Sequence, residues 1–211
     1  MEKKELEKRI FPCEVRAIED DRGKLIEGRP IVFNKTTDLG WFDEVIVAGA
    51  LDETDLTDVR FLVNHDLSSI PLARSRRNNG NSTMQLIPDF EGMQIKAYVD
   101  TENNTRASEL YSAVDRGDIT GMSFMFSIDG YEWIDLDSDH PTRRITKIGT
   151  VIEVSAVTFP AYEQTEIYAR DQKMLDSIKR ELDNARAEAR GSVDTDNTLE
   201  LLKAKTKTLT L

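Results

Sequence analysis

The segment from Met122 to Ile128 constrains the fold of this chain more than any other part of the sequence. Large apolar side chains occupy every second position of this segment, and two serines and a methionine lie between them. Successive side chains of a strand point to opposite faces, so this alternation predicts a β-strand with one face in a core. The β-branched run Thr150–Phe159 predicts a second strand, which Pro160 would end.

The rest of residues 10–168 predicts further strands and few helices. The predicted strands are Gly28–Phe33, Val45–Val47, Val59–His65, Thr83–Ile87 and Met93–Val99, and the last two flank a five-residue hairpin loop, Pro88–Gly92. The predicted helices are a short piece at Gly49–Asp58 and an amphipathic helix with Ala107, Leu110, Tyr111 and Val114 on one face, capped by Asn104 or Thr105 and ended by Gly117. This order favours a mainly β fold with helices, built as a closed or strongly curved sheet, over a doubly wound fold.

Residues 170–211 have a different character. No Gly or Pro interrupts Arg170–Arg190, and an apolar stripe at Met174, Leu175, Ile178 and Leu182 predicts a helix. A polar linker at 191–197 and a Leu/Lys/Thr-rich end follow. We therefore predict a main domain at 1–169 and a helical tail with linker at 170–211. The tail is either a solvated helix with a frayed end or an arm that docks a partner or is removed.

Composition excludes several classes of function. The chain carries 39 acidic and 28 basic side chains, a net charge of −11, which argues against a partner that is a nucleic acid. No run of about 18 apolar residues exists, so no segment is expected to span a membrane. The single cysteine, Cys13, excludes an internal disulfide framework and a multi-thiolate zinc site. We expect a soluble cytosolic protein.

Only two histidines could act as a general base near neutral pH. His140 lies in a polar loop before Pro141, where an exposed loop residue is the simplest interpretation. His65 ends an apolar strand and begins a turn, which is a typical place for a rigidly held functional group. The alternative for His65 is a strand-end histidine that bonds a neighbouring carbonyl group.

Nucleophile candidates are Ser123, Ser155 and Cys13. Ser123 follows Gly121-Met122 and lies on the strand face opposite the large apolar side chains, where a solvent-facing serine is the simple alternative. Ser155 is a rival nucleophile on the second strand. Cys13 is a rival as well, although a lone thiol is more often a small buried apolar group.

Glu153 lies in the apolar run of the second strand and needs a partner, because an unpaired buried carboxylate would cost several kcal/mol. One interpretation is a structural ion pair with Arg60, Arg143 or Arg144. The other is a hydrogen bond from a histidine ring, which would make a serine, a histidine and a carboxylate a candidate triad.

No metal or cofactor is expected. The two histidines have no second His or Cys nearby, and no glycine-rich phosphate loop is present. The loop at Asp135–Pro141 begins like a calcium loop, but His140 replaces the required glycine and Thr146 the required glutamate.

Four ordered segments resemble the prohead maturation protease family of tailed phages, which is similar to the herpesvirus assemblins. They are Asp38–Ile46 with Gly49-Ala50-Leu51, Asp58–Asp66, Arg116–Phe124 and Glu153–Ala161, and together they cover roughly residues 25–165. The resemblance implies an assemblin-like β-barrel surrounded by helices. It also implies that Ser123 is the nucleophile, that His65 is its general base and that Glu153 orients His65. The arginine pair of the assemblin oxyanion hole has no counterpart after Glu153, and Arg143-Arg144 before it is the candidate pair.

The resemblance further implies a function and partners. The chain would be a serine endopeptidase inside the immature procapsid in the host cytoplasm. It would cleave scaffold, or the scaffold-like extension of the major capsid protein, and itself, with self-association such as a dimer. Activity should fall at low pH, because a cationic imidazole cannot accept the serine proton. The alternative is a capsid assembly or scaffolding factor without proteolysis, which would use the 170–211 tail.

Overall fold

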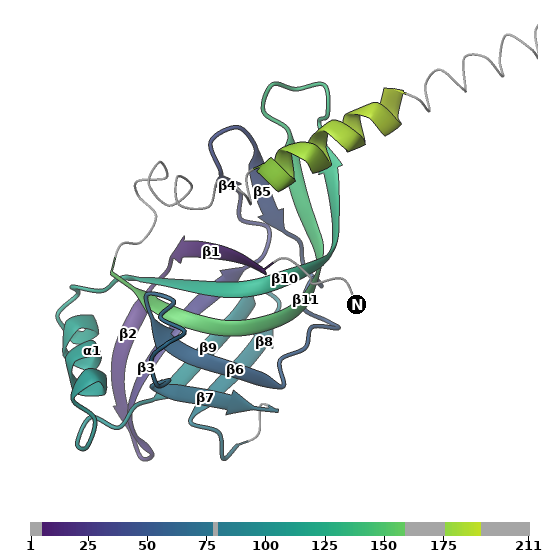
Figure 1. The fold of residues 1–211 in the computed structure, drawn as a ribbon. Helices are drawn as coiled ribbons and strands as arrows, with labels where there is room; N and C mark the ends of the chain where they lie inside the picture. Colours follow the sequence, from purple (N-terminus) through teal and green to yellow (C-terminus); the bar gives the residue numbers. More distant parts are fainter. Residues whose placement is uncertain (1–5, 78–79, 159–175, 191–211) are drawn as a thin grey trace, which may run out of the picture.

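The computed structural model describes residues 6–77, 80–158 and 176–190, and the side chains of residues 10–12 are not described. Two β-sheets, in which most strand pairs are antiparallel, form the body (Figure 1). The larger sheet has the order β1-β10-β11-β5-β4, with β6 on β11 and β7 on β6. Its strands are β1 (Leu6–Pro12), β4 (Thr37–Asp38), β5 (Asp43–Ile46), β6 (Asp58–Val63), β7 (Ala73–Arg76), β10 (Gly121–Ile134) and β11 (Thr142–Val157).

The smaller sheet has the order β2-β3-β9-β8. Its strands are β2 (Val15–Asp20), β3 (Gly23–Val32), β8 (Met84–Asp89) and β9 (Gly92–Tyr98). β8 and β9 form the predicted hairpin, but its turn is shorter than predicted because Pro88 and Asp89 belong to β8. Asp89 accepts the backbone N–H groups of Glu91 and Gly92, and Gly92 adopts a φ of +145°, which only glycine adopts readily.

The core lies between the sheets and explains the alternation of β10. Met122, Phe124 and Phe126 are fully buried on the core side, and the two phenyl rings lie 4.6 Å apart. Gly28 on β3 allows Met122 to approach closely, since a Cβ at Gly28 would lie 2.8 Å from the Met122 sulfur. The strand predicted around Met122–Ile128 is thus confirmed, and its apolar face joins the two sheets.

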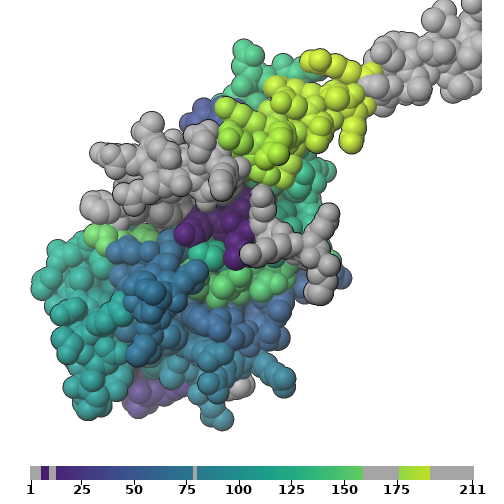
Figure 2. Space-filling model, in the orientation of Figure 1, coloured from purple at the N-terminus to yellow at the C-terminus, as the bar shows by residue number. Residues whose placement is uncertain are grey.

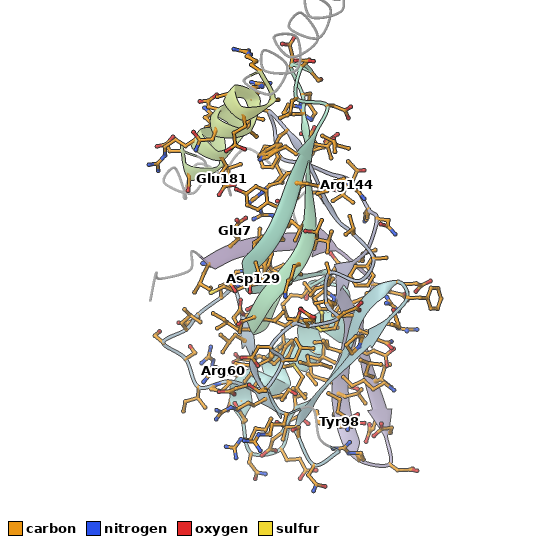
Figure 3. The ribbon with its side chains drawn as sticks, turned by 90° about the vertical axis from the view of Figure 1, so that its right-hand side faces the viewer. Glu7, Arg60, Tyr98, Asp129, Arg144 and Glu181 are labelled. Atoms are coloured by element: carbon orange, nitrogen blue, oxygen red, sulfur yellow. The ribbon has the colours of Figure 1, made fainter. Side chains whose placement is uncertain are left out.

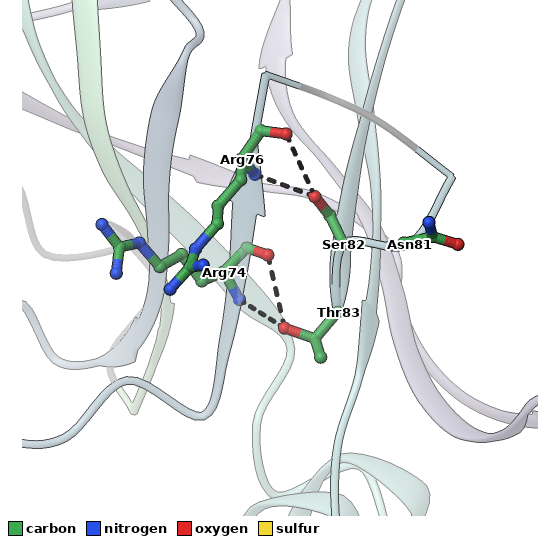
Figure 4. A pocket seen from close by; sticks show the side chains of 5 residues that line it. All are labelled: Arg74, Arg76, Asn81, Ser82 and Thr83. Atoms are coloured by element: carbon green, nitrogen blue, oxygen red, sulfur yellow. Dashed lines mark hydrogen bonds between the residues drawn. The ribbon is translucent and has the colours of Figure 1, made fainter.

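The expected β-barrel surrounded by helices is wrong. Among the described residues neither sheet closes on itself, and the helices are α1 (Thr105–Asp115) and one at 176–190. At one junction of the sheets, the backbone N–H groups of Arg74 and Arg76 on β7 bond the side-chain hydroxyls of Thr83 and Ser82 (Figure 4). At this junction β7 bonds side-chain hydroxyls, whereas a closed barrel would need hydrogen bonds between the backbones of two neighbouring strands.

The helix predictions have mixed outcomes. α1 begins after Asn104, whose side chain accepts the N–H groups of Arg106 and Ala107, so the predicted cap is confirmed. Residues 49–58 form turns and a bridge instead of the predicted short helix. Part of the predicted tail helix is present at 176–190; residues 170–175 and the linker lie outside the described residues. No helix in the described ranges is long and apolar enough to cross a membrane.

The helix at 176–190 packs at the end of the molecule that holds the β10–β11 hairpin (Figure 2). Ile178 is buried there with Leu39 and Phe42, against the rings of Trp41 and Trp133. These aromatic rings lie 4.5–6.3 Å from one another.

Candidate active site

Three polar side chains share one face of the larger sheet. Ser123 on β10 lies directly opposite Ser155 on β11, and Glu153 precedes Ser155 by two residues. Opposed residues of an antiparallel pair point to the same face, with Cβ atoms about 4.5–5.5 Å apart. All three residues are fully buried. The face opposite the apolar core is therefore polar and closed to solvent at this point.

A left-handed turn brings His65 to the same face. β6 ends at Val63, and Asn64 and His65 have φ angles of 52° and 58°. Glu153 lies beside Arg60 in the parallel register of β11 and β6. If β6 continued unbroken, alternation would place His65 on the face opposite to Arg60. The predicted strand position of His65 is therefore wrong, and the turn is what allows its ring to reach Glu153.

Glu153 contacts a histidine and none of the three arginines that were considered as its partners. The His65 Nδ1 atom lies 2.5 Å from Glu153 Oε1. Arg60 and Arg144 pair with other carboxylates, and Arg143 belongs to a separate buried cluster. Of the four partners considered from the sequence, only the histidine ring is within hydrogen-bonding distance of Glu153 in the described residues.

The second ring nitrogen of His65 and the Ser123 hydroxyl are not bonded to each other in this structure. His65 Nε2 is buried and has no hydrogen-bond partner among the described residues. The Ser123 hydroxyl donates to the backbone carbonyl oxygen of Arg9 at 2.7 Å. Arg9 belongs to β1, which runs along β10 with Ile10 opposite Ser123. A backbone carbonyl carries no sequence signal, so this partner of Ser123 could not be predicted.

The surroundings of the two rival nucleophiles, Ser155 and Cys13, do not favour an attacking group. The Ser155 hydroxyl donates to Glu153 Oε2 at 2.5 Å and accepts the backbone N–H of His65 at 3.0 Å. Burial raises the pKa of the Cys13 thiol, despite hydrogen bonds from the backbone of Arg29 and Met122. A raised pKa disfavours the thiolate, which is the reactive form.

A buried ionic cluster anchors β1. Glu7 and Arg9 on β1 pair with Glu44 on β5 and Arg143 on β11, and each of the four is at most 7% exposed. Burial alone would raise the pKa of Glu7, but the two guanidinium groups hold it below its usual range. Arg143 also forms an ion pair with Glu181 of the helix, with 3.1 Å between Nη2 and Oε2, and Figure 3 shows Glu7 and Glu181 on the same side of the long hairpin. β1 was not predicted from the sequence, because Glu7, Lys8 and Arg9 interrupt the apolar and polar alternation that indicates a strand.

The candidate oxyanion-hole pair, Arg143-Arg144, does not lie at Ser123. Arg143 is opposite Trp133 on β10, about ten residues along the strand from Ser123, and Arg144 is opposite Glu132. Neither side chain serves that role in this conformation.

Two other groups could attract ligands. His140 is exposed, as predicted, and its Nε2 lies 3.1 Å from Asp43 and 3.8 Å from Asp38; the three ligand atoms lie within 4.8 Å of one another. An open pocket is lined by Arg74, Arg76, Asn81, Ser82 and Thr83 (Figure 4). Arg76 is opposite Asp58 at the start of β6, whereas His65 follows its end. Arg74, however, is opposite Arg60, which is itself opposite Glu153, so this edge of the pocket lies two strands from Glu153.

Comparison with known proteins defines the class. Residues 11–180 match the family described as caudovirus prohead serine protease. The chain belongs to this family, and the resemblance seen in its sequence is confirmed. It is therefore a serine protease of phage capsid maturation.

A solved structure similar to this chain is the capsid assembly protease gp21 of bacteriophage T4. The two share 14% sequence identity with a TM-score of 0.40, over 72% of this chain and 98% of gp21. No curated protein matches the chain.

Proposed function

We propose that the chain is an endopeptidase of the Ser-His-Glu type, with Ser123 as nucleophile, His65 as general base and Glu153 as the group that orients His65. The observation that carries the proposal is the 2.5 Å contact between His65 Nδ1 and Glu153, with His65 Nε2 buried and without a hydrogen-bond partner in the part of the chain that the structure describes. A carboxylate at Nδ1 fixes the proton there and leaves the Nε2 lone pair for the nucleophile.

The reaction follows from these roles. Ser123 Oγ attacks the scissile carbonyl carbon while His65 Nε2 takes its proton, and Glu153 stabilises the resulting imidazolium. His65 then gives that proton to the leaving amine, and an acyl group remains on Ser123. Water, deprotonated by His65, hydrolyses this ester and restores the enzyme.

The conformation described here is closed to a peptide. Ser123 is fully buried, and its hydroxyl is held by the Arg9 carbonyl. For reaction, the Ser123 side chain must leave this carbonyl for His65 Nε2, and the substrate carbonyl must gain access. The proposed mechanism therefore includes a shift of the segment around β1.

The proposed substrates are scaffold, or the scaffold-like extension of the major capsid protein, and the enzyme itself. Capsid and scaffold proteins are the partners that a capsid maturation protease requires. We also propose that the domain ends near residue 169, that residues 170–211 are a packaging or autolysis arm, and that the enzyme acts inside the procapsid in the host cytoplasm as a self-associated form. Mass spectrometry of purified wild type should show shortening between about 165 and 200, while Ser123→Ala stays full length.

Coexpression with the capsid and scaffold proteins of the same phage tests the activity. Ser123→Ala should abolish cleavage. Ser127→Ala is the matched control, because Ser127 is a nearly buried serine on the same face of β10 whose hydroxyl accepts only the Thr150 N–H among the bonds described. Cleavage by Ser123→Ala at the wild-type rate would overturn the proposal and favour a non-proteolytic assembly factor.

A further inference from the structure

The turn that carries His65 is held by an unusual set of contacts. Asn64 and His65 are consecutive residues with positive φ, a conformation that side chains with a Cβ disfavour, although asparagine tolerates it best. The Asn64 side chain is clamped to Thr158: its amide donates to Thr158 Oγ1 at 2.8 Å, and its oxygen accepts the Thr158 N–H at 2.9 Å. Within residues 6–77, 80–158 and 176–190, the hydrogen bond of the His65 side chain is the one to Glu153.

Ser155 restrains both the backbone of His65 and the carboxylate that faces the His65 ring. Its hydroxyl oxygen accepts the His65 backbone N–H at 3.0 Å, and its proton is donated to Glu153 Oε2 at 2.5 Å. The other carboxylate oxygen of Glu153 meets His65 Nδ1. The three residues therefore form a closed ring of hydrogen bonds, in which one hydroxyl fixes both the backbone of the histidine and the carboxylate that faces its ring.

We propose that Ser155 is a positioning residue of the active site, an inference that rests on the proposed function. It holds the Glu153 carboxylate with Oε1 toward His65 Nδ1, and it holds the His65 backbone in the left-handed turn. Both restraints fix the direction in which His65 Nε2 points. Ser155 does not act as the nucleophile, because its proton is committed to Glu153 and one of its lone pairs to the His65 N–H.

A purely structural role would have different consequences. Ser155 is fully buried, so loss of its hydroxyl could lower stability without changing the chemistry of any folded molecule. A positioning role instead lowers kcat at unchanged KM and changes the environment of the His65 ring. These readouts separate the two roles in protein that remains folded.

The experiment compares Ser155→Ala and Ser155→Cys with Ser127→Ala. The alanine variant removes the hydroxyl and leaves a small space; the cysteine variant fills the space with a weak donor and acceptor, and it keeps the test decisive if the alanine variant fails to fold. Ser127→Ala removes a nearly buried hydroxyl from the neighbouring strand. With purified capsid or scaffold protein as substrate, both Ser155 variants should lose about 10- to 100-fold in kcat with little change in KM. Ser127→Ala should keep the wild-type kcat.

Nitrogen-15 NMR of the histidine rings gives a readout that needs no activity. The chain has two histidines, so His140→Gln leaves the His65 ring signals alone. The short contact with Glu153 predicts a strongly downfield Nδ1 proton for His65, and both Ser155 variants should shift or broaden it while Ser127→Ala leaves it in place.

Unchanged kcat together with an unchanged His65 signal in the Ser155 variants would overturn the positioning role. An equal loss of kcat in Ser127→Ala would do the same. If wild type and Ser123→Ala are both inactive, the proposed function fails. The NMR result then decides the Ser155 role separately: a His65 signal that depends on Ser155 upholds the ring restraint, and an independent one refutes it.

Discussion

Changing Glu153 to glutamine tests how the carboxylate controls His65. Glutamine has almost the same shape, but its amide has one acceptor and one donor end. With the oxygen toward Ser155, the hydrogen bond from the Ser155 hydroxyl is kept and the NH₂ group faces His65 Nδ1. His65 must then carry its proton on Nε2, and it cannot accept the proton of Ser123.

The opposite orientation keeps the reactive tautomer but has a cost. With the NH₂ group toward Ser155, the Ser155 hydroxyl proton loses its acceptor in a fully buried site. An unsatisfied buried group costs about 1–3 kcal/mol, which is roughly a 5- to 150-fold preference for the unreactive arrangement. Loss of the negative charge that stabilises the imidazolium adds to this, and the acid-to-amide change in a Ser-His-Asp triad lowers kcat by about 10⁴. We therefore expect kcat of Glu153→Gln to fall by about 10²- to 10⁴-fold.

The assay is single-turnover cleavage of the capsid substrate, followed by mass spectrometry, with circular dichroism to establish that the variant is folded. Glu132→Gln is the control, since Glu132 is an exposed carboxylate on β10 that pairs with Arg144. A folded Glu153→Gln enzyme that keeps more than about a tenth of the wild-type kcat would refute the role given to Glu153.

Three further predictions concern stability and are measured by urea denaturation. Arg143→Met should cost about 3–5 kcal/mol because it leaves buried carboxylates undercompensated, whereas the exposed Arg144→Met should cost at most about 1 kcal/mol; equal costs would contradict the importance of the buried cluster. The pKa of Glu7 is lowered in the folded state, so the stability that its carboxylate contributes is present above pH 4.5, the ordinary pKa of the group, and is lost as the pH falls through the lower folded-state pKa. Glu7→Gln should reduce this loss of stability in acid, and an unchanged dependence of the unfolding free energy on pH would argue against the contribution of Glu7. Gly92→Ala would place a Cβ 2.0 Å from a carbonyl oxygen of β3 at a φ of +145°, so it should cost at least about 3 kcal/mol, while Gly80→Ala, with nothing within 4 Å, should cost little.

Local patterns predicted local structure well. The alternation around Phe124 identified the core face of β10, and Asn104 identified the start of α1, because each signal depends on residues close in the chain. Whether the sheet closes into a barrel could not be predicted in the same way. Closure depends on how sheet edges meet, and here the side-chain hydroxyls of Ser82 and Thr83, rather than backbone groups, bond β7.

The residues of the candidate site were proposed from the sequence, but their geometry was not. An apolar strand around Glu153 required a partner, and His65 was among those considered. A turn at His65 was predicted, but its left-handed backbone at Asn64 and His65 was not, because side-chain alternation carries no information about the backbone conformation where a strand ends. The coverage of Ser123 by β1 was missed because it depends on pairing across more than a hundred residues and on a backbone carbonyl.

Covalent trapping during turnover tests the central claim most directly. Wild-type enzyme that is cleaving capsid protein is treated with a fluorophosphonate, and the modified residue is located by mass spectrometry. We predict one adduct on Ser123, which is absent when His65 is replaced by alanine. An adduct on Ser155 instead, or trapping at Ser123 that does not depend on His65, would contradict the proposed triad.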